Sequence, residues 1–302
     1  MLRAVRRLIR LAQEHRLERS EFHRGEQISR ADAVFVVGCG RSGTTLMRAM
    51  LDRHPNLWGG PESWIWLQPV DPPILALKFG LEVGEIREML ARSRTGVEFA
   101  ERCFGECAKR AGKKRWVEKT PRHVQFLPYL MHSFPNAKFI HMVRDGRDVA
   151  CSLRHHPKAK MTPKGAVPIR VDNPIGFCID RWVRDTSAGL AYQGHPRLLT
   201  VRYERLIAET DRTMREVCDF LCEPFHPEIL VPQDGQLERN AGSVPSNLTS
   251  FEPINSASVG RWRRDLRTGE LAICLRKGGA LLQTLGYWDG EPISEPHGPD
   301  AT

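Results

Sequence analysis

Long hydrophobic runs are absent from this chain of 302 residues. No segment approaches the roughly 18–20 consecutive apolar residues of a membrane-spanning helix, and the N-terminus lacks the apolar core of a secretory signal. These absences predict a protein without a membrane span. We therefore expect it in the cytoplasm.

Cysteine pairs of the kind that bind zinc are also lacking. None of the eight cysteines forms a C-x-x-C motif. The pairs Cys103/Cys107 and Cys218/Cys222 have helical spacing but no nearby histidine at ligand spacing. The pattern predicts reduced thiols that pack as small apolar side chains, and no metal site.

Acidic residues are fewer than basic ones in this chain. The chain has 45 Lys+Arg against 36 Asp+Glu, a formal net charge of +9. Such a balance favours anionic ligands, nucleic acid or an acidic membrane as partners. The sequence offers no clustered aromatic and basic residues on which bases would stack, so we expect no nucleic-acid partner. The hydrophobic content of 41% is ordinary for a globular protein.

Composition divides the chain into three parts. Residues 1–30 predict a basic amphipathic helix. Its first part, residues 1–20, either touches an anionic membrane surface or packs on the rest of the protein or on a partner. Residues 31–290 predict a folded region large enough to bury a substantial core. Residues 291–302, rich in proline, glycine and acid, predict a flexible tail.

Short apolar runs alternate with helical patterns along the middle of the chain. The predicted buried strands are Ala33–Val37, Arg115–Glu118, Lys138–Val143 and Leu198–Arg202. Apolar stripes that predict helices lie at Leu46, Met47, Met50 and Leu51, at Met214, Val217, Cys218 and Leu221, and at Ile175, Ile179, Trp182 and Leu190. This alternation favours an α/β fold with a mostly parallel sheet and helices on both faces.

The lysine of an ATP- or GTP-binding loop is missing from a loop that otherwise matches one. The stretch "VFVVGCGRSGTTLMRAML" reads as strand, loop and helix with Gly38 and Gly43 of that pattern. Thr44 stands at the lysine position, and Arg41 lies inside the loop. The glycines let backbone N–H groups approach an oxyanion, and the following helix adds its positive dipole end. None of the predicted strands ends in a magnesium-binding aspartate, so a small-molecule kinase is disfavoured and stays an alternative.

Two further strand ends carry cations. Lys119 follows the second predicted strand, and Arg144 follows the third, with Ser152 one helical stretch further on. Ligands of parallel sheets bind beyond the carboxyl ends of the strands, so these cations and Arg41 are expected in one crevice. The conjunction predicts a site for more than one anionic group. Taken alone, the turn that contains Arg144 would more often be a solvated turn with local ion pairs, and Lys119 could be one more surface lysine.

Two stretches together resemble the nucleotide motifs of one enzyme family. The stretch "GRSGTTLMRAMLDRHPN" closely resembles the 5′-phosphosulfate-binding loop of the sulfotransferases, nearest to the tyrosylprotein and carbohydrate members. The stretch "FIHMVRDGRDVACSL" resembles the motif with which that family holds the 3′-phosphate of 3′-phosphoadenosine 5′-phosphosulfate (PAPS). "VRYERL" and "INSASVGRWRRDL" are similar to later segments, so the resemblance runs from about Ala33 to Trp288. It implies a P-loop NTPase-like fold and assigns residues 31–290 to a sulfotransferase domain.

The resemblance also implies an activity, the metal-free, in-line transfer of a sulfuryl group from PAPS to a hydroxyl acceptor. The donor-binding residues that it implies are Arg41, Ser42, Gly43, Thr44, Thr45, Arg144, Ser152, Tyr203 and Arg261. Arg41 and Lys119 would neutralise the charge that develops on the leaving phosphate. A non-catalytic basic nucleotide-binding module is the second alternative, next to the kinase.

Transfer to a hydroxyl needs a base that removes its proton. A gap-free alignment from Arg41 with the tyrosylprotein enzymes puts Glu62 of "GGPESW" on their catalytic glutamate and Lys119 of "EKTP" on their catalytic lysine. Three rival bases stay open: His54, His123 and Glu118.

One departure from the tyrosylprotein pattern concerns the acceptor. Those enzymes carry an arginine two positions after the glutamate, where this chain has Trp64. The difference disfavours peptide tyrosine and leaves a saccharide, lipid-linked or small-molecule hydroxyl as the expected acceptor. Trp64 and Trp66 either stack on a sugar or aromatic ring or belong to the core. The basic loop from about His155 to Asn173 is a candidate substrate-entry flap, whose basic residues either steer an acidic acceptor or are merely solvated.

Overall fold

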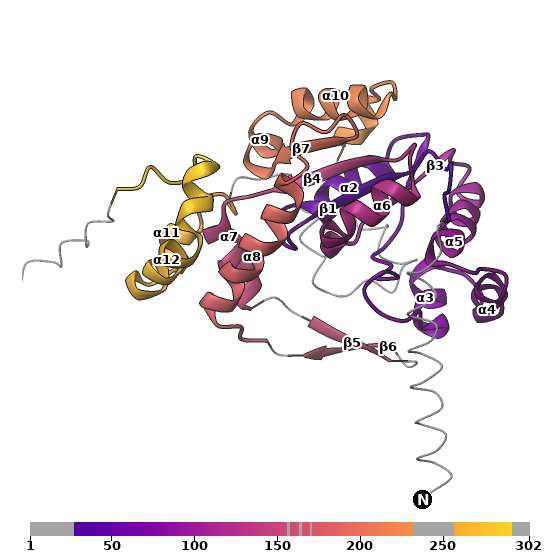
Figure 1. Cartoon of the computed structure of the whole chain (residues 1–302), viewed down its shortest axis with the longest axis horizontal. Helices are drawn as coiled ribbons and strands as arrows, with labels where there is room; N and C mark the ends of the chain where they lie inside the picture. The colour runs from indigo at the N-terminus through magenta and orange to yellow at the C-terminus, as the bar shows by residue number, and fades with distance from the viewer. Residues whose placement is uncertain (1–26, 156–157, 163–164, 170, 232–256, 292–302) are drawn as a thin grey trace, which may run out of the picture.

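The computed structural model describes residues 27–155, 158–162, 165–169, 171–231 and 257–291. Its elements are β1 (Val34–Gly38), α2 (Thr44–Asp52), β2 (Leu57–Gly59), α3 (Pro72–Phe79), α4 (Val83–Ala91), α5 (Gly96–Arg110), β3 (Arg115–Glu118), the 3-10 helix η1 (Pro121–Phe126), α6 (Leu127–Ser133), β4 (Lys138–Val143), α7 (Gly146–Arg154), β5 (Lys158–Thr162), β6 (Gly165–Ile169), α8 (Ile175–Leu190), β7 (Leu198–Arg202), α9 (Tyr203–Ala208), α10 (Thr210–Leu221), the 3-10 helix η2 (Pro227–Leu230), α11 (Trp262–Asp265) and α12 (Thr268–Thr284) (Figure 1).

The predicted end segments lie almost wholly outside this part of the chain. Of the helix predicted over residues 1–30, only residues 27–30 are described, and they form no helix. Of the tail predicted over residues 291–302, only the first residue is described. The division of the chain into these parts therefore stays a prediction.

Five parallel strands form the central sheet, in the order β2-β3-β1-β4-β7. The middle strand pairs on one side with β3, where Phe35 faces Glu118, and on the other with β4, where Phe35 faces Phe139. The predicted α/β fold with a parallel sheet is confirmed. Because β3, β1 and β4 are neighbours, the loops that follow their carboxyl ends lie side by side.

Helices cover both faces of the sheet. Phe35 and Val37 of β1 point into a cluster with the apolar sides of α3, α4, α5, η1 and α6. Val34 and Val36 point the other way, into a cluster with α2, α9, α10 and η2. A third cluster joins α7, α8 and α12, which lie at the opposite end of the molecule from α3, α4 and α5 (Figure 1). The three inner strands β1, β3 and β4 are buried on both faces, which is typical of the middle of a parallel sheet.

Sequence patterns found the long buried elements and missed the short or polar ones. Three of the four predicted strands have the predicted bounds, and β1 lies one residue later than expected. The three apolar stripes fall on α2, α10 and α8, and all of their members except Leu46 and Leu190 are buried. β2 was not predicted, and the expected loop over residues 155–173 contains the antiparallel hairpin β5–β6. The structure describes the backbone of this hairpin but not the side chains of its basic residues.

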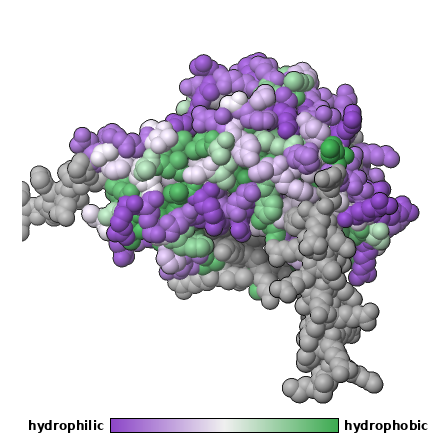
Figure 2. Space-filling model, viewed as in Figure 1, coloured by the Kyte–Doolittle hydropathy of each residue, from purple (hydrophilic) through white to green (hydrophobic). Residues whose placement is uncertain are grey.

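Paired charges cover much of the outer surface. Figure 2 shows a hydrophilic surface over α9 and α10, where exposed ion pairs such as Arg215–Asp211 lie. No helix among the described residues is long and apolar enough to cross a membrane. All eight cysteines are free thiols, and all but Cys222 are buried.

Candidate active site

The loop between β1 and α2 depends on two glycines. Gly38 has a φ of 139°, and a Cβ there would lie 2.4 Å from the carbonyl oxygen of Met142. Gly43 has a φ of 89°, and its Cβ would lie 2.5 Å from the ring of Tyr203. Only glycine fits both the conformation and the space at these positions. The loop therefore passes close to the end of β4 and to the start of α9.

This loop is suited to an anion. The first N–H groups of α2 have no partner within their helix, and they carry its positive dipole end. The hydroxyl of Ser42 is buried and makes no hydrogen bond to the described part of the chain. A buried hydroxyl without a partner is costly unless a ligand supplies one. An oxyanion at the start of α2 would satisfy both sets of donors.

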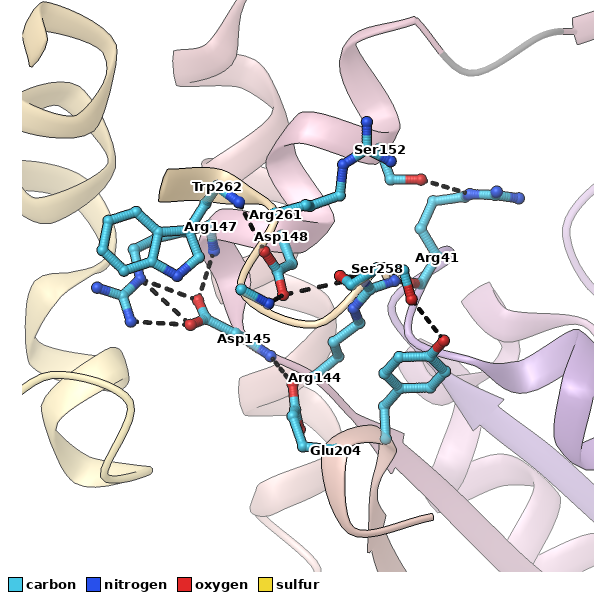
Figure 3. Close-up of polar contacts among 12 residues, drawn as sticks. Arg41, Arg144, Asp145, Arg147, Asp148, Ser152, Glu204, Ser258, Arg261 and Trp262 are labelled. Carbon is cyan, nitrogen blue, oxygen red and sulfur yellow. Dashed lines mark hydrogen bonds and ion pairs between the residues drawn. The ribbon is translucent and has the colours of Figure 1, made fainter. Parts of the chain in front are cut away.

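Arg41 and Arg144 meet beside this loop (Figure 3). Arg41 has a φ of 75°, a strained conformation for a residue other than glycine. Its Nε donates to Ser152 Oγ at 2.9 Å, while Arg144 donates to the Arg41 carbonyl at 3.1 Å and lies over the Tyr203 ring at 4.4 Å. Burial lowers the pKa of Arg41, and the neighbouring Arg144 lowers it further. Buried cations this close to each other would be stabilised by an anionic ligand.

The segment before α11 closes on these two arginines. Arg144 donates to the carbonyl of Ser258, and the Ser258 hydroxyl lies 2.7 Å from the Tyr203 hydroxyl. The buried carboxylate of Asp148 accepts from the N–H groups of Gly260 at 2.8 Å and Trp262 at 3.0 Å. These bonds hold the returning chain against the start of α7 (Figure 3).

Arg261 points elsewhere than the other predicted donor ligands. Its guanidinium pairs with Asp265 at 2.6 Å, one helical turn on, and its side chain is one-third exposed. Arg147, the second arginine of the same motif, pairs with Asp145 at 2.8 Å and lies 3.9 Å from the Trp262 ring centre. Arg147 therefore joins α7 to α11.

Glu62 and Lys119 form an ion pair at the neighbouring strand end. Lys119 Nζ lies 2.6 Å from Glu62 Oε1 and donates to Thr45 Oγ1 at 3.3 Å, which joins the pair to α2. Lys119 is buried, whereas the Glu62 side chain is 26% exposed. Among the described residues only Oε1 of this carboxylate is hydrogen bonded. Lys78, from the last turn of α3, donates to the Glu62 backbone carbonyl at 3.1 Å.

Burial and the neighbouring charges determine the protonation states of Glu62 and Lys119. Burial alone would raise the pKa of Glu62, but Lys119 and Lys78 outweigh it and hold that pKa below its usual value. Burial lowers the pKa of Lys119 against the opposing attraction of Glu62. The carboxylate is therefore ionised at neutral pH and able to accept a proton.

The three rival bases are all buried. Glu118 accepts from Ser63, Thr120 and His123, so its oxygens are fully engaged. His123 is buried beside it. His54 lies at the end of α2, where its ring accepts from the next turn and contacts the Pro224 carbonyl at 2.8 Å. Of the four candidates, only Glu62 is partly exposed.

The two tryptophans after Glu62 have different surroundings. Trp66 is in the core, with its ring 5.9 Å from that of Phe35, so the core alternative is correct for this residue. Trp64 is partly exposed and has a φ of 61°. It is the only one of the two that an acceptor can reach.

Comparison with known proteins shows which family this chain belongs to. A model of the sulfotransferase family matches residues 33–227, more than half of the chain. The chain belongs to the sulfotransferase family. The resemblance of its two nucleotide motifs to that family is confirmed.

Relatives within the family include protein-tyrosine sulfotransferases of animals. The Drosophila melanogaster protein is 28% identical over 284 residues, which cover 87% of this chain and 52% of that relative. Protein-tyrosine sulfotransferase 1 of Danio rerio is 30% identical over 287 residues, which cover 87% of this chain and 73% of the relative. The chain thus spans only about half the length of the first of these sulfotransferases.

Solved sulfotransferases share the fold. The sulfotransferase domain from the curacin biosynthetic pathway has a TM-score of 0.60 and 20% identity, covering 84% of this chain and 98% of that domain. Mouse SULT7A1, solved in complex with PAP, has a TM-score of 0.50 and 15% identity, covering 89% of this chain and 95% of the other. At these identities the likeness concerns the fold alone.

The structure separates the predicted sulfotransferase residues into two groups. Arg41, Arg144, Ser152 and Tyr203 gather at one end of the loop, and Glu62, Lys119 and Thr45 at the other. Sequence reasoning missed Asp148 and Ser258. An aspartate in the first turn after "RDG" was a usable sign for Asp148, but Ser258 meets Arg144 only because the chain returns after 114 residues.

Proposed function

We propose that this protein transfers the sulfuryl group of PAPS to a hydroxyl acceptor. The observation that carries the proposal is the Glu62–Lys119 pair, bonded through Thr45 to the anion-binding loop. A base, a cation and an oxyanion site thus lie together at the carboxyl edge of the sheet. Family membership supports the reaction class, and the PAP bound to a neighbour with the same fold supports the donor.

Two sites would divide the donor between them. The start of α2, with Ser42, Thr44 and Thr45, would hold the 5′-phosphosulfate. Arg144, with Ser152 and the ring of Tyr203, would hold the 3′-phosphate end. A buried guanidinium binds phosphate through several directed N–H groups, which fixes position as well as charge. Arg261 would close over the donor only after leaving Asp265.

The transfer step follows from the positions of the pair. The acceptor oxygen attacks sulfur while the bond from sulfur to the 5′-phosphate oxygen breaks, and the electron pair of that bond stays on the phosphate. The acceptor proton passes to the unbonded Oε2 of Glu62. The products are a sulfate ester and adenosine 3′,5′-bisphosphate, the compound abbreviated PAP above. Lys119, with Arg41, would stabilise the charge that grows on the leaving phosphate.

A saccharide, lipid-linked or small-molecule hydroxyl is the acceptor that we favour over peptide tyrosine. Trp64 stands two residues after Glu62, and its partly exposed ring offers an apolar face next to the reacting carboxylate. Sugars and aromatic rings both stack on such a face. A panel of saccharides, simple phenols and an acidic tyrosine peptide, each with labelled PAPS, separates these classes; turnover of the peptide alone would contradict our choice.

A cytoplasmic location, with peripheral membrane contact through residues 1–20, is a further part of the proposal. Eight free thiols, seven of them buried, suit a reducing compartment. Fractionation of cells that express the full chain tests this. Recovery with secreted proteins would contradict it, and release from membranes by salt would support the contact.

Calorimetric titration with adenosine 3′,5′-bisphosphate, with and without EDTA, tests the donor site. We expect micromolar binding that EDTA does not change. Absence of binding, together with magnesium-dependent binding of ATP, would replace the transferase by the kinase. Binding of nucleotide without turnover of any acceptor or of PAPS itself would favour the non-catalytic module.

A further inference from the structure

A buried polar cluster lies directly behind the Glu62–Lys119 pair. It consists of Glu118, Ser63, Thr120 and His123, and is called the Glu118 cluster below. Glu118 oxygens accept from Ser63 Oγ at 2.8 Å, Thr120 Oγ1 at 2.6 Å, the Thr120 N–H at 3.2 Å and His123 Nδ1 at 2.8 Å. All four residues are less than 10% exposed. The carboxylate has no oxygen left for a substrate.

The Thr120 hydroxyl extends the cluster to the backbone beside Glu62. Its oxygen donates to Glu118 and accepts from the N–H groups of Ser63 at 3.1 Å and Trp64 at 3.3 Å. One hydroxyl thus connects the loop after β2 to the end of β3. The cluster fixes the two residues that follow Glu62, including the strained backbone of Trp64.

Each member of the ion pair is covalently next to this cluster. Glu62 precedes Ser63, and Lys119 lies between Glu118 and Thr120. The pair is held at 2.6 Å although the carboxylate is 26% exposed and open to competing water. Attraction to the buried Lys119 does not by itself fix the orientation of a carboxylate that water can also reach. Hydrogen bonds from neighbours that are themselves fixed can provide that geometry.

We propose that Glu118 and Thr120 are positioning residues, which hold the Glu62 carboxylate opposite Lys119 without touching substrate. This inference rests on the proposed function. The cluster acts by fixing the backbone on both sides of the pair. Its loss displaces the base, and small displacements of a catalytic group cost on the order of 10²-fold in rate.

Two substitutions at one position separate positioning from mere folding. Thr120→Val keeps the branched shape and removes the hydroxyl, whereas Thr120→Ser keeps the hydroxyl. Glu223→Gln is the matched control, because Glu223 is a buried carboxylate bonded to Asn56 and Arg115 at the other end of β3. All variants are compared with wild type for thermal unfolding, for the Kd of adenosine 3′,5′-bisphosphate, and for release of sulfate from labelled PAPS with water as the acceptor.

We expect Thr120→Val to lower the rate at saturating PAPS on the order of 10²-fold and to leave the Kd within about twofold. Thr120→Ser should restore most of the rate, and Glu223→Gln should lose stability but keep its rate per folded molecule. Equal rates for Thr120→Val and wild type would overturn the positioning role. Failure of wild type to bind the nucleotide would instead overturn the proposed function.

Crystal structures of Thr120→Val and Thr120→Ser give a readout that needs no turnover. The proposal requires that Glu62 leave Lys119, or take several conformations, in the valine variant alone. An unchanged pair in both variants would overturn it even where water proves too poor an acceptor for rates.

Discussion

A buried cation lies near each end of strand β3, and the two cations differ in how fully neighbouring carboxylates neutralise them. At its start, Arg115 has two carboxylates, Asp32 at 2.7 Å and Glu223 at 2.8 Å, and it also donates to backbone carbonyls. At its end, Lys119 has one carboxylate, Glu62, which also lies in the field of Lys78. Within the described residues, Arg115 thus has more negative charge beside it than it needs, whereas Lys119 shares its one carboxylate partner with Lys78.

Under the proposed function, the difference separates a charge that stabilises the fold from one that serves the reaction. A buried cation that stabilises a fold needs full neutralisation within the protein, because an unpaired buried charge costs several kcal/mol. The carboxyl edge of the sheet instead collects Arg41, Arg144 and Lys119 around the buried Asp148 and the half-open Glu62. Such an excess of positive charge is tolerable where an anionic ligand completes the site.

The largest effect expected from this comparison comes from neutralising each cation in turn. Lys119→Met should lower transfer by about 10³-fold, since one lost transition-state donor costs about 10²–10³-fold or more, and should leave the fold intact. Arg115→Met should cost about 3–5 kcal/mol of stability while each folded molecule keeps its rate. Urea unfolding and turnover of labelled PAPS measure both. The comparison is wrong if Arg115→Met lowers the rate per folded molecule as much as Lys119→Met does.

A second effect concerns a buried ionisable group that has no hydrogen-bond partner in the described part of the chain. His141 of β4 is fully buried, neither ring nitrogen is hydrogen bonded within the described residues, and its ring abuts Gly189. Burial lowers the pKa of His141 to about 4. Its unfolded pKa is about 6.5, so the unfolded chain binds more protons between those values, and stability falls as the pH falls through that window.

Over the whole window this amounts to about 3 kcal/mol. His141→Leu should remove that dependence, so that urea midpoints measured at pH 7.5 and 5.0 differ less than in wild type. The carboxylates with lowered pKa values, Glu62 and Glu118, lose their stabilisation only at lower pH, below about 4.5. An equal pH dependence in the variant would show that other groups control acid stability.

How much of this could be read from the sequence depends on whether the information is local. The strands β1, β3 and β4 were predictable because each is a run buried on both faces, and β7, a partly buried edge strand, because its residues are mostly apolar or β-branched. β2 was not, because three residues, Leu57–Gly59, carry too little pattern. The placement of Arg41, Lys119 and Arg144 after the carboxyl ends of neighbouring strands followed from the rule that parallel strands present those ends at one edge.

The identity of the open carboxylate was not predictable in this way. The alignment with the tyrosylprotein enzymes favoured Glu62 as the base and left Glu118 as a rival. That Glu118 is the closed carboxylate depends on Ser63, Thr120 and His123 converging on it. Trp64 and Trp66 likewise separate only through the backbone turn that sends one to the core. Such assignments require contacts between distant segments, which a single sequence does not show.

A third prediction compares the two groups of site residues. Arg144→Ala should weaken binding of adenosine 3′,5′-bisphosphate by about 10–100-fold, because hydrogen bonds to charged groups contribute about 1.5–3 kcal/mol. Glu62→Gln, at the other group, should leave that Kd almost unchanged and lower the transfer rate by about 10²–10⁴-fold. Calorimetry and turnover at saturating PAPS separate the two. Weak nucleotide binding in Glu62→Gln would show that the groups are not independent.

The smallest effect is expected where a charge pair has neither burial nor a ligand. Glu88 of α4 and Arg92, which follows the last residue of that helix, are 2.8 Å apart, but their side chains are 59% and 69% exposed. Exposed pairs contribute about 0–1 kcal/mol and weaken with salt, so Glu88→Gln should change the free energy of unfolding by less than about 0.5 kcal/mol and leave turnover unchanged. Urea unfolding at low and high salt measures this. A loss near that of Arg115→Met would mean that pairing itself, rather than burial, decides what a charge contributes in this protein.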